Sequence, residues 1–95
     1  MRIRFTETAL AEIEEIHSYI ATDNPAAADI VRSQVEHTVA LIGTLPRMGR
    51  VKYRQVVRML PVRRYPQYLI FYAIEANEVV ILNVRHGARR HPWEK

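Results

Sequence analysis

The sequence contains no cysteine, so neither a disulfide nor a thiolate metal site can stabilise the fold. It also lacks a long apolar run: the longest one, near Tyr68 to Ala76, is interrupted by Glu75 and is far shorter than the ~20 residues that span a bilayer. Met1 to Phe5 alternate charged and apolar side chains, unlike the start of a signal peptide. We therefore expect a cytoplasmic protein without a membrane span, stabilised by packing.

The composition is that of an ordinary globular protein. The chain has 95 residues, of which 48% are hydrophobic and 25% are charged. These fractions are far from the low hydrophobicity of disordered chains, and the length suits one domain. The sequence predicts a single domain that spans residues 1–95.

Charge is divided unevenly along the chain. Residues 1–46 carry three basic and seven acidic side chains, a net charge of −4, whereas residues 47–95 carry eleven basic and three acidic ones, a net charge of +8. Segregation of this size in one small domain predicts a positive face that attracts polyanions or acidic protein segments. We expect the functional surface in the second half.

Two apolar stripes at helical spacing lie in the first half. Their residues are Leu10, Ile13, Ile16 and Ile20, then Val31, Val35, Thr38, Ile42 and Leu45. Such spacing predicts two helices, which a short connection would join into an antiparallel hairpin. The acidic side chains in this part of the chain are predicted to be exposed to solvent; they are Glu12, Glu14, Glu15 and Asp23.

Capping residues mark the ends of both helices. Thr6 or Thr8 can cap the first helix, and Asn24 followed by Pro25 is typical of a second helix start. Gly43 and Pro46 are stop signals for the second helix.

The second half changes to the pattern of β-strands. With Met1–Phe5 included, four strands are predicted: Met1–Phe5, Val56–Val62, Tyr68–Ile74 and Val79–His86, with turns at Arg63–Pro66 and Glu75–Glu78. Short connections between consecutive strands predict an antiparallel meander. The expected fold is α+β, in the order β-α-α-β-β-β, with the helical hairpin packed on one face of the sheet.

Strand periodicity assigns side chains to faces. In the last strand, Val80, Leu82, Val84 and His86 are expected on one face, and Val79, Ile81, Asn83 and Arg85 on the other. The first set would face the helices. Arg85 belongs to the second set and would lie outside the helix-packed core, so its truncation is expected to cost little stability. Pro61 and Pro66 have no amide hydrogen to donate to a neighbouring strand. We therefore expect the strand Val56–Val62 to lie at the edge of the sheet or to bend at Pro61.

The second half also resembles a known family. The segment from Val57 to Tyr72, the segment from Val79 to Arg89, and above all His86-Gly87-Ala88-Arg89 are similar to the carboxy-terminal part of RelE/ParE toxins. This resemblance implies a bacterial cytoplasmic toxin of the plasmid-stabilisation type, neutralised by a cognate antitoxin that is expected to be small, acidic and encoded nearby. It implies no cofactor.

Two target classes share this resemblance, and they require different chemistry. RelE-like members are ribosome-dependent mRNA ribonucleases, and the matching candidates for catalysis are Lys52, Arg54, His86 and Arg89. However, Gln67 and Tyr68 stand where ribonuclease members present an arginine. The tail has His91 and Trp93 without the tyrosine expected there. We therefore expect no cleavage of free RNA by the chain alone.

ParE-like members instead inhibit DNA gyrase by binding and need no catalytic residues. The incomplete catalytic set favours this class. Candidate contacts with target or antitoxin are Arg58, Arg63, Arg64, Arg85, Arg89 and Arg90. A plain nucleic-acid-binding module is the weakest alternative, because no base-reading motif accompanies the basic residues.

The remaining histidines and tyrosines favour structural roles. His17 and His37 lie on predicted helices without a second suitable ligand nearby, so no metal site is expected. Tyrosines Tyr65, Tyr68 and Tyr72 could stack on bases, but packing within strands is the favoured interpretation. Gly87 is expected to bend the chain after the last strand.

Overall fold

The structure is a computed structural model that describes residues 1–88. Its elements are β1 (Arg2–Phe5), α1 (Glu7–Ala21), α2 (Pro25–Thr44), β2 (Arg50–Tyr53), β3 (Val57–Val62), β4 (Tyr65–Glu75) and β5 (Glu78–His86). The α+β class and the predicted order are confirmed. β2 is an additional strand that the sequence pattern did not predict.

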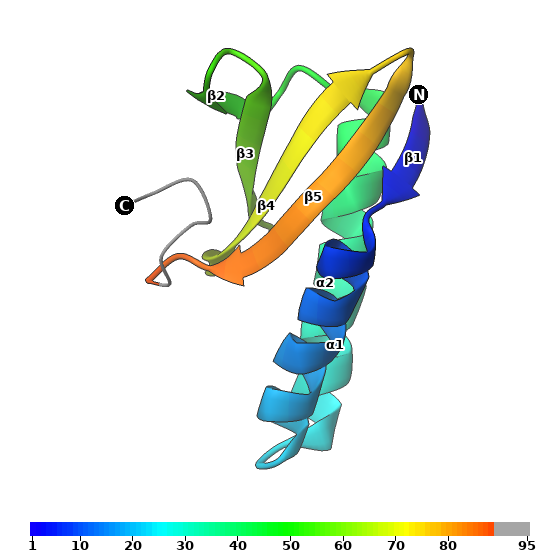
Figure 1. Cartoon of the computed structure of the whole chain (residues 1–95). Coiled ribbons are helices and arrows are strands. Elements are labelled where there is room, and N and C mark those ends of the chain that lie inside the picture. The colour runs from blue at the N-terminus through cyan, green and yellow to red at the C-terminus, as the bar shows by residue number, and fades with distance from the viewer. Residues whose placement is uncertain (89–95) are drawn as a thin grey trace.

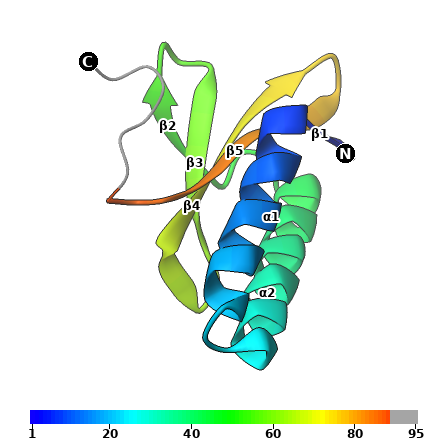
Figure 2. The ribbon, with the colours of Figure 1, turned by 60° about the horizontal axis from the view of Figure 1, so that its bottom comes forward.

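The five strands form one mixed sheet in the order β1-β5-β4-β3-β2. β1 runs parallel to β5, and the other neighbouring strands are antiparallel. The helices lie side by side as a hairpin against one face of the sheet and project beyond its end (Figures 1 and 2). Within residues 1–88, no helix is both long and apolar enough to cross a membrane.

The predicted caps hold both helices at their starts. The Thr6 hydroxyl accepts a hydrogen bond from the amide of Ala9 (3.0 Å), and the Asn24 side chain accepts one from the amide of Ala27 (3.0 Å). Each bond satisfies a backbone donor that the first helical turn leaves unpaired. The hairpin therefore begins at the residues that the sequence indicated.

The core lies between the hairpin and the sheet. Its buried residues are Ala9, Val35, Val39, Ile42, Val62, Ile70, Tyr72, Val79, Ile81 and Val84. Leu10 is 51% exposed and Glu12 is buried, so the predictions for these two residues are wrong, whereas Ile13 and Ile16 pack against the core as expected. α1 lies along β5, and its inward face is centred on Ala9 and Glu12.

A register shift in β5 overturns the predicted assignment of faces. Phe71 pairs with Asn83, and Tyr72 pairs with Ile81, so Leu82 has no partner on β4. An extra residue of this kind forms a β-bulge, which changes the side to which the following side chains point. Val79 and Ile81 therefore join Val84 in the helix-covered core, contrary to strict alternation.

The prolines of β3 and β4 lie at irregular or strand-end positions. β2 pairs only with Val57–Met59, so Pro61 lies on the edge of the sheet, and the register shifts immediately after it. β3 is not the edge strand that was expected, since β2 pairs with its first half, but the register shift after Pro61 agrees with the expected bend there. β4 begins at Tyr65, so the second residue of this strand is Pro66, which had been expected in the turn.

Candidate functional site

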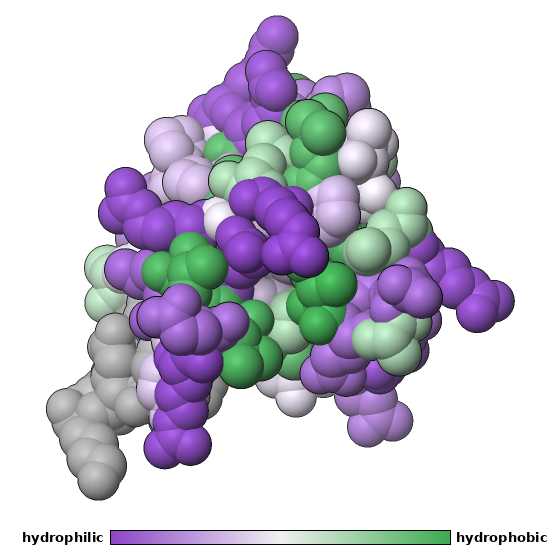
Figure 3. All heavy atoms as spheres, turned by 90° about the horizontal axis from the view of Figure 1, so that it is seen from above, coloured by the Kyte–Doolittle hydropathy of each residue, from purple (hydrophilic) through white to green (hydrophobic). Residues whose placement is uncertain are grey.

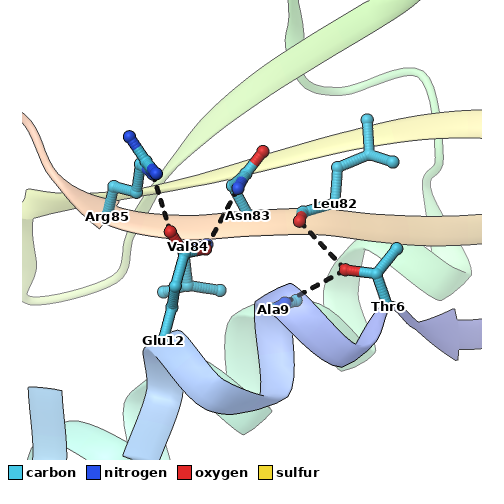
Figure 4. Close-up of polar contacts among 7 residues, drawn as sticks. All are labelled: Thr6, Ala9, Glu12, Leu82, Asn83, Val84 and Arg85. Carbon is cyan, nitrogen blue, oxygen red and sulfur yellow. Dashed lines mark hydrogen bonds and ion pairs between the residues drawn. The ribbon is translucent and has the colours of Figure 1, made fainter. Parts of the chain in front are cut away.

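Glu12 binds the last part of β5 with both carboxylate oxygens (Figure 4). Its Oε1 accepts hydrogen bonds from the Asn83 side chain (3.1 Å) and the Val84 amide (3.0 Å). Its Oε2 accepts one from Arg85 Nε (2.7 Å). Three donors compensate the cost of burying this carboxylate, which is only 7% exposed.

These contacts also close the edge of β5 where β1 ends. The amide of Thr6 donates to the carbonyl of Ile81 (3.0 Å), and its hydroxyl donates to the carbonyl of Leu82 (3.0 Å). Glu12 then accepts the amide of Val84. The start of α1 thus replaces the missing strand with side-chain and capping contacts.

Arg85 is a structural residue, contrary to the sequence-based expectation. It is ion-paired with the buried Glu12 carboxylate, and its side chain is only 19% exposed. The bulge at Leu82 and the position of α1 at the strand edge bring Arg85 to the helix. Its expected position away from the helices is therefore wrong, and a contact with a target would compete with this pair.

Arg58 and Tyr72 fix the segment that leads into β2. Arg58 Nη1 donates to the carbonyls of Arg47 (3.2 Å) and Gly49 (2.9 Å). The Tyr72 hydroxyl donates to the carbonyl of Pro46 (2.7 Å) and accepts from the amide of Gly49 (2.9 Å). Burial raises the pKa of Tyr72, against the opposing effects of the Gly49 hydrogen bond and the Arg58 charge. Arg58, a predicted contact residue, thus has a structural role.

Basic side chains without acidic neighbours occupy the segment from residue 47 to residue 64, here called the basic segment. Its cations are Arg47, Arg50, Lys52, Arg54, Arg58, Arg63 and Arg64, and it contains no Asp or Glu. In the described part of the chain, the Arg and Lys residues in ion pairs are Arg4, Arg32 and Arg85, all outside it. The positive charge of this segment is therefore not neutralised by nearby carboxylates of residues 1–88.

Four cations of the basic segment form two exposed groups. Lys52 and Arg54 are exposed on β2 and its turn, and the Arg54 guanidinium lies 5.3 Å from the centroid of the Tyr53 ring. Arg63 and Arg64 are exposed in the β3–β4 turn, where Arg64 has a φ of 71°. The two exposed groups lie at opposite ends of β3.

His86 lies at the end of β5, where it packs edge-on against the Tyr68 ring with 5.4 Å between centroids. Its Nδ1 accepts a hydrogen bond from the amide of Ala88 (3.1 Å). An open groove of about 550 Å³ lies at this end of the sheet, lined by Glu15, Ile16, Tyr19, Tyr68, His86 and Ala88. Both contacts of His86 are with neighbouring parts of the fold, so they favour a structural role for this side chain at the end of β5.

Three of the four predicted catalytic candidates lie in the described part of the fold, on two different strands or their ends. Lys52 and Arg54 belong to the β2 side and His86 to β5, with β3 and β4 between them. Three strand spacings of about 4.8 Å put these strands roughly 14 Å apart along the sheet. Arg89, Arg90, His91 and Trp93 lie outside the described residues. Among residues 1–88, no three His, Asp or Glu side chains are grouped as a metal site would require.

Comparison with known proteins relates the whole arrangement to one family. The sequence model described as "ParE toxin of type II toxin-antitoxin system, parDE" matches residues 3–91. The protein named "Putative toxin Y4kP" of Sinorhizobium fredii is 35% identical over 91 residues, which cover 96% of this chain and 93% of the relative. The solved structure titled "Chromosomal ParDE TA system from P. aeruginosa" has a similar fold, with a TM-score of 0.78 and 20% identity over 90% of this chain and 95% of the other.

Proposed function

The chain belongs to the ParE toxin family of type II toxin-antitoxin systems, and from this premise we propose that it inhibits growth by binding DNA gyrase. The family match over residues 3–91 is the observation that carries the proposal. A binding inhibitor needs a complementary surface, and the unneutralised basic segment supplies one.

The dispersion of the catalytic candidates supports a binding inhibitor over a ribonuclease. RNA cleavage requires a proton-transfer group and cations within reach of one phosphate. Here Lys52 and Arg54 are separated from His86 by two strands, and His86 contacts Tyr68 and Ala88. Gln67 stands in place of the arginine that ribonuclease members present.

The contact with gyrase is assigned to the cations at the β3–β4 end of the sheet. Arg63 and Arg64 are exposed and have no carboxylate partner within residues 1–88. Arg89 and Arg90 remain candidate contacts from the sequence and lie outside the described residues. Arg58 and Arg85 are instead engaged in contacts within the fold, with Gly49 and with Glu12.

A cognate antitoxin is the second proposed partner. Its support is the family, together with the solved ParDE system whose fold this chain shares. The +8 charge of residues 47–95 favours an acidic protein as this partner. We propose that it is small, that the adjacent reading frame encodes it, and that the two proteins meet in the bacterial cytoplasm.

Induction of the chain in cells tests the proposal. We expect growth arrest with loss of negative supercoiling in a reporter plasmid, and relief of both by co-expression of the adjacent frame. Cleavage sites within translated messages should not appear. New message ends with unchanged plasmid topology would instead identify a RelE-like ribonuclease.

A further inference from the structure

The β3–β4 turn brings two cations together at the surface. β3 ends at Val62, β4 begins at Tyr65, and these two residues pair with each other, so the turn itself consists of Arg63 and Arg64. Both side chains are exposed, and neither has a carboxylate within 4.0 Å among residues 1–88. Guanidinium groups form strong charge-assisted hydrogen bonds with carboxylates. The turn is therefore a compact positive site that fits acidic side chains of a partner.

The backbone of this turn is not one that a hairpin holds by itself. Of its two residues only the second has a positive φ, 71° at Arg64, as is typical of a type II turn. Turns of that type splay the twisted strands of a hairpin, and arginine is unfavourable in the left-handed region. In the two-residue β4–β5 turn, by contrast, Ala76 and Asn77 both have positive φ, as in a favoured hairpin turn. The β3–β4 turn therefore needs support from elsewhere in the fold.

The strand pairing next to the turn is irregular as well. Pro61 pairs with Leu69, whereas the next residue, Val62, pairs with Tyr65. Residues 66–68 of β4 consequently have no register partner on β3. A disrupted ladder restrains the adjoining backbone less than a regular one does. The sheet alone thus gives the two arginines little fixed orientation.

A buried threonine of α2 supplies the missing support. The Thr38 hydroxyl accepts a hydrogen bond from the amide of Arg63 (3.1 Å) and donates one to the carbonyl of Gln34 (2.7 Å). Thr38 is 0% exposed, so close packing and both hydrogen bonds hold its hydroxyl in one place. The first residue of the turn is thereby fixed to the helical hairpin.

The position of Thr38 indicates that its hydroxyl does more than pack. Thr38 belongs to the apolar stripe of α2, between Val35 and Ile42, and both of these neighbours in the stripe are buried. Valine is also branched at Cβ and would fill such a position without a polar atom that needs a partner. The contact with Arg63 is therefore what threonine adds at this position.

We propose that Thr38 is a positioning residue for growth inhibition, whose hydroxyl fixes the β3–β4 turn so that Arg63 and Arg64 meet carboxylates of the target in a set orientation. This inference rests on the proposed contact between that turn and gyrase. Unfavourable backbone conformations persist at functional sites where the surrounding fold enforces them. Cations that are ordered before binding also lose less entropy than flexible ones. Thr38 acts through the turn, since it is itself buried.

Removal of the hydroxyl tests this role. Thr38→Val should raise the toxin concentration for half-inhibition of gyrase supercoiling by about fivefold or more, because the turn is no longer fixed. Thr38→Ser keeps the hydroxyl and should stay within about twofold of the wild type. Growth arrest after induction is measured for the same variants and should follow the same order. Thermal melting of each purified variant establishes that it is folded at the assay temperature.

Thr44→Val is the matched control. Thr44 is the exposed last residue of α2, and its hydroxyl donates to the carbonyl of Ala40 (3.3 Å), as that of Thr38 does to Gln34. α2 ends away from the β3–β4 turn (Figure 1), at the end of the molecule where Figure 3 shows hydrophobic areas separated by hydrophilic ones. This variant should inhibit gyrase within about twofold of the wild type.

A combined variant separates positioning from a general loss of folded protein. Arg64→Gln removes one of the two positioned charges, so Thr38→Val added to it should weaken inhibition by less than about twofold. A residue that merely stabilised the fold would weaken inhibition by the same factor in both backgrounds. Equal factors would therefore overturn the positioning role.

Hydrogen exchange of the wild-type chain tests the contact without a substitution. The amide of Arg63 should exchange at least about tenfold more slowly than that of Ala76, the first residue of the β4–β5 turn. Equal rates, or wild-type inhibition by Thr38→Val, would overturn the role of Thr38 and leave the gyrase proposal intact. Growth arrest by a wild type that leaves gyrase active would overturn the target, and the order of the variants in growth arrest would still decide the role of Thr38. Absence of any growth arrest by the wild type would overturn both.

Discussion

Glu12 is the residue at which the sequence pattern and the fold disagree most. An acidic side chain beside an apolar stripe normally faces solvent, which is why the sequence predicted an exposed position. The fold instead uses its carboxylate to satisfy the Val84 amide at an unpaired strand edge. Sequence alone does not reveal this role, because it depends on β1 ending before β5 does.

Replacement of Glu12 by alanine should strongly destabilise the fold. The substitution removes the acceptor of the Val84 amide and of the Asn83 side chain, and it removes the carboxylate that pairs with the partly buried Arg85. Breaking a buried ion pair from one side typically costs about 3–5 kcal/mol. Urea denaturation measures the change in the free energy of unfolding.

Glu15→Ala is the matched control, because Glu15 is an exposed glutamate on the same helix. Its effect on the free energy of unfolding should be within about 0.5 kcal/mol. Equal effects of the two substitutions would show that Glu12 is not a structural residue. Arg85→Ala removes the other partner of the same ion pair, so any effect of that substitution on growth inhibition has to be compared with its effect on stability.

Among the elements, the helical hairpin was predicted well and the sheet only in part. Asn24, Pro25 and the Val31–Ile42 stripe carry local signals that survive in the fold. β2 escaped prediction because it has four residues and its turn uses Arg54 and Gln55 at φ of 49° and 62°, where glycine or asparagine would be the usual signal. Its strand conformation depends on pairing with β3.

The connection between β4 and the segment before β2 depends on the Tyr72 hydroxyl. Tyr72→Phe removes one donor and one acceptor and leaves the Gly49 amide and the Pro46 carbonyl unpaired. We expect a loss of about 1–3 kcal/mol in the free energy of unfolding near neutral pH. Urea denaturation of wild type and variant at matched pH values checks this.

The pH dependence of that difference has a definite sign. Burial raises the folded-state pKa of Tyr72 above its ordinary value of about 10, so the neutral hydroxyl stabilises the fold below that pH. This contribution is lost as pH rises through the raised pKa, and Tyr72→Phe has no such group to ionise. The stability advantage of the wild type should therefore shrink above about pH 10. A constant or growing advantage there would contradict the role assigned to the hydroxyl.

At the scale of the whole molecule, charge and family were accessible from sequence, whereas the arrangement of the site was not. The unequal charge of the two halves and the ending His86-Gly87-Ala88 were visible in the chain. The separation of Lys52 from His86 required the strand order, and the closure of one sheet edge required the position of α1. The sequence indicated Arg58 and Arg85 as contacts with a partner, but in the fold they bind Gly49 and Glu12 of the same chain.

Inhibition of purified gyrase is the most direct measurement of the central proposal. The chain should block ATP-dependent supercoiling of relaxed plasmid in proportion to its concentration, and the adjacent-frame protein should restore activity. The same preparation should leave both naked RNA and ribosome-bound message intact. Full gyrase activity at saturating toxin, together with cleavage of ribosome-bound message, would contradict the proposed function.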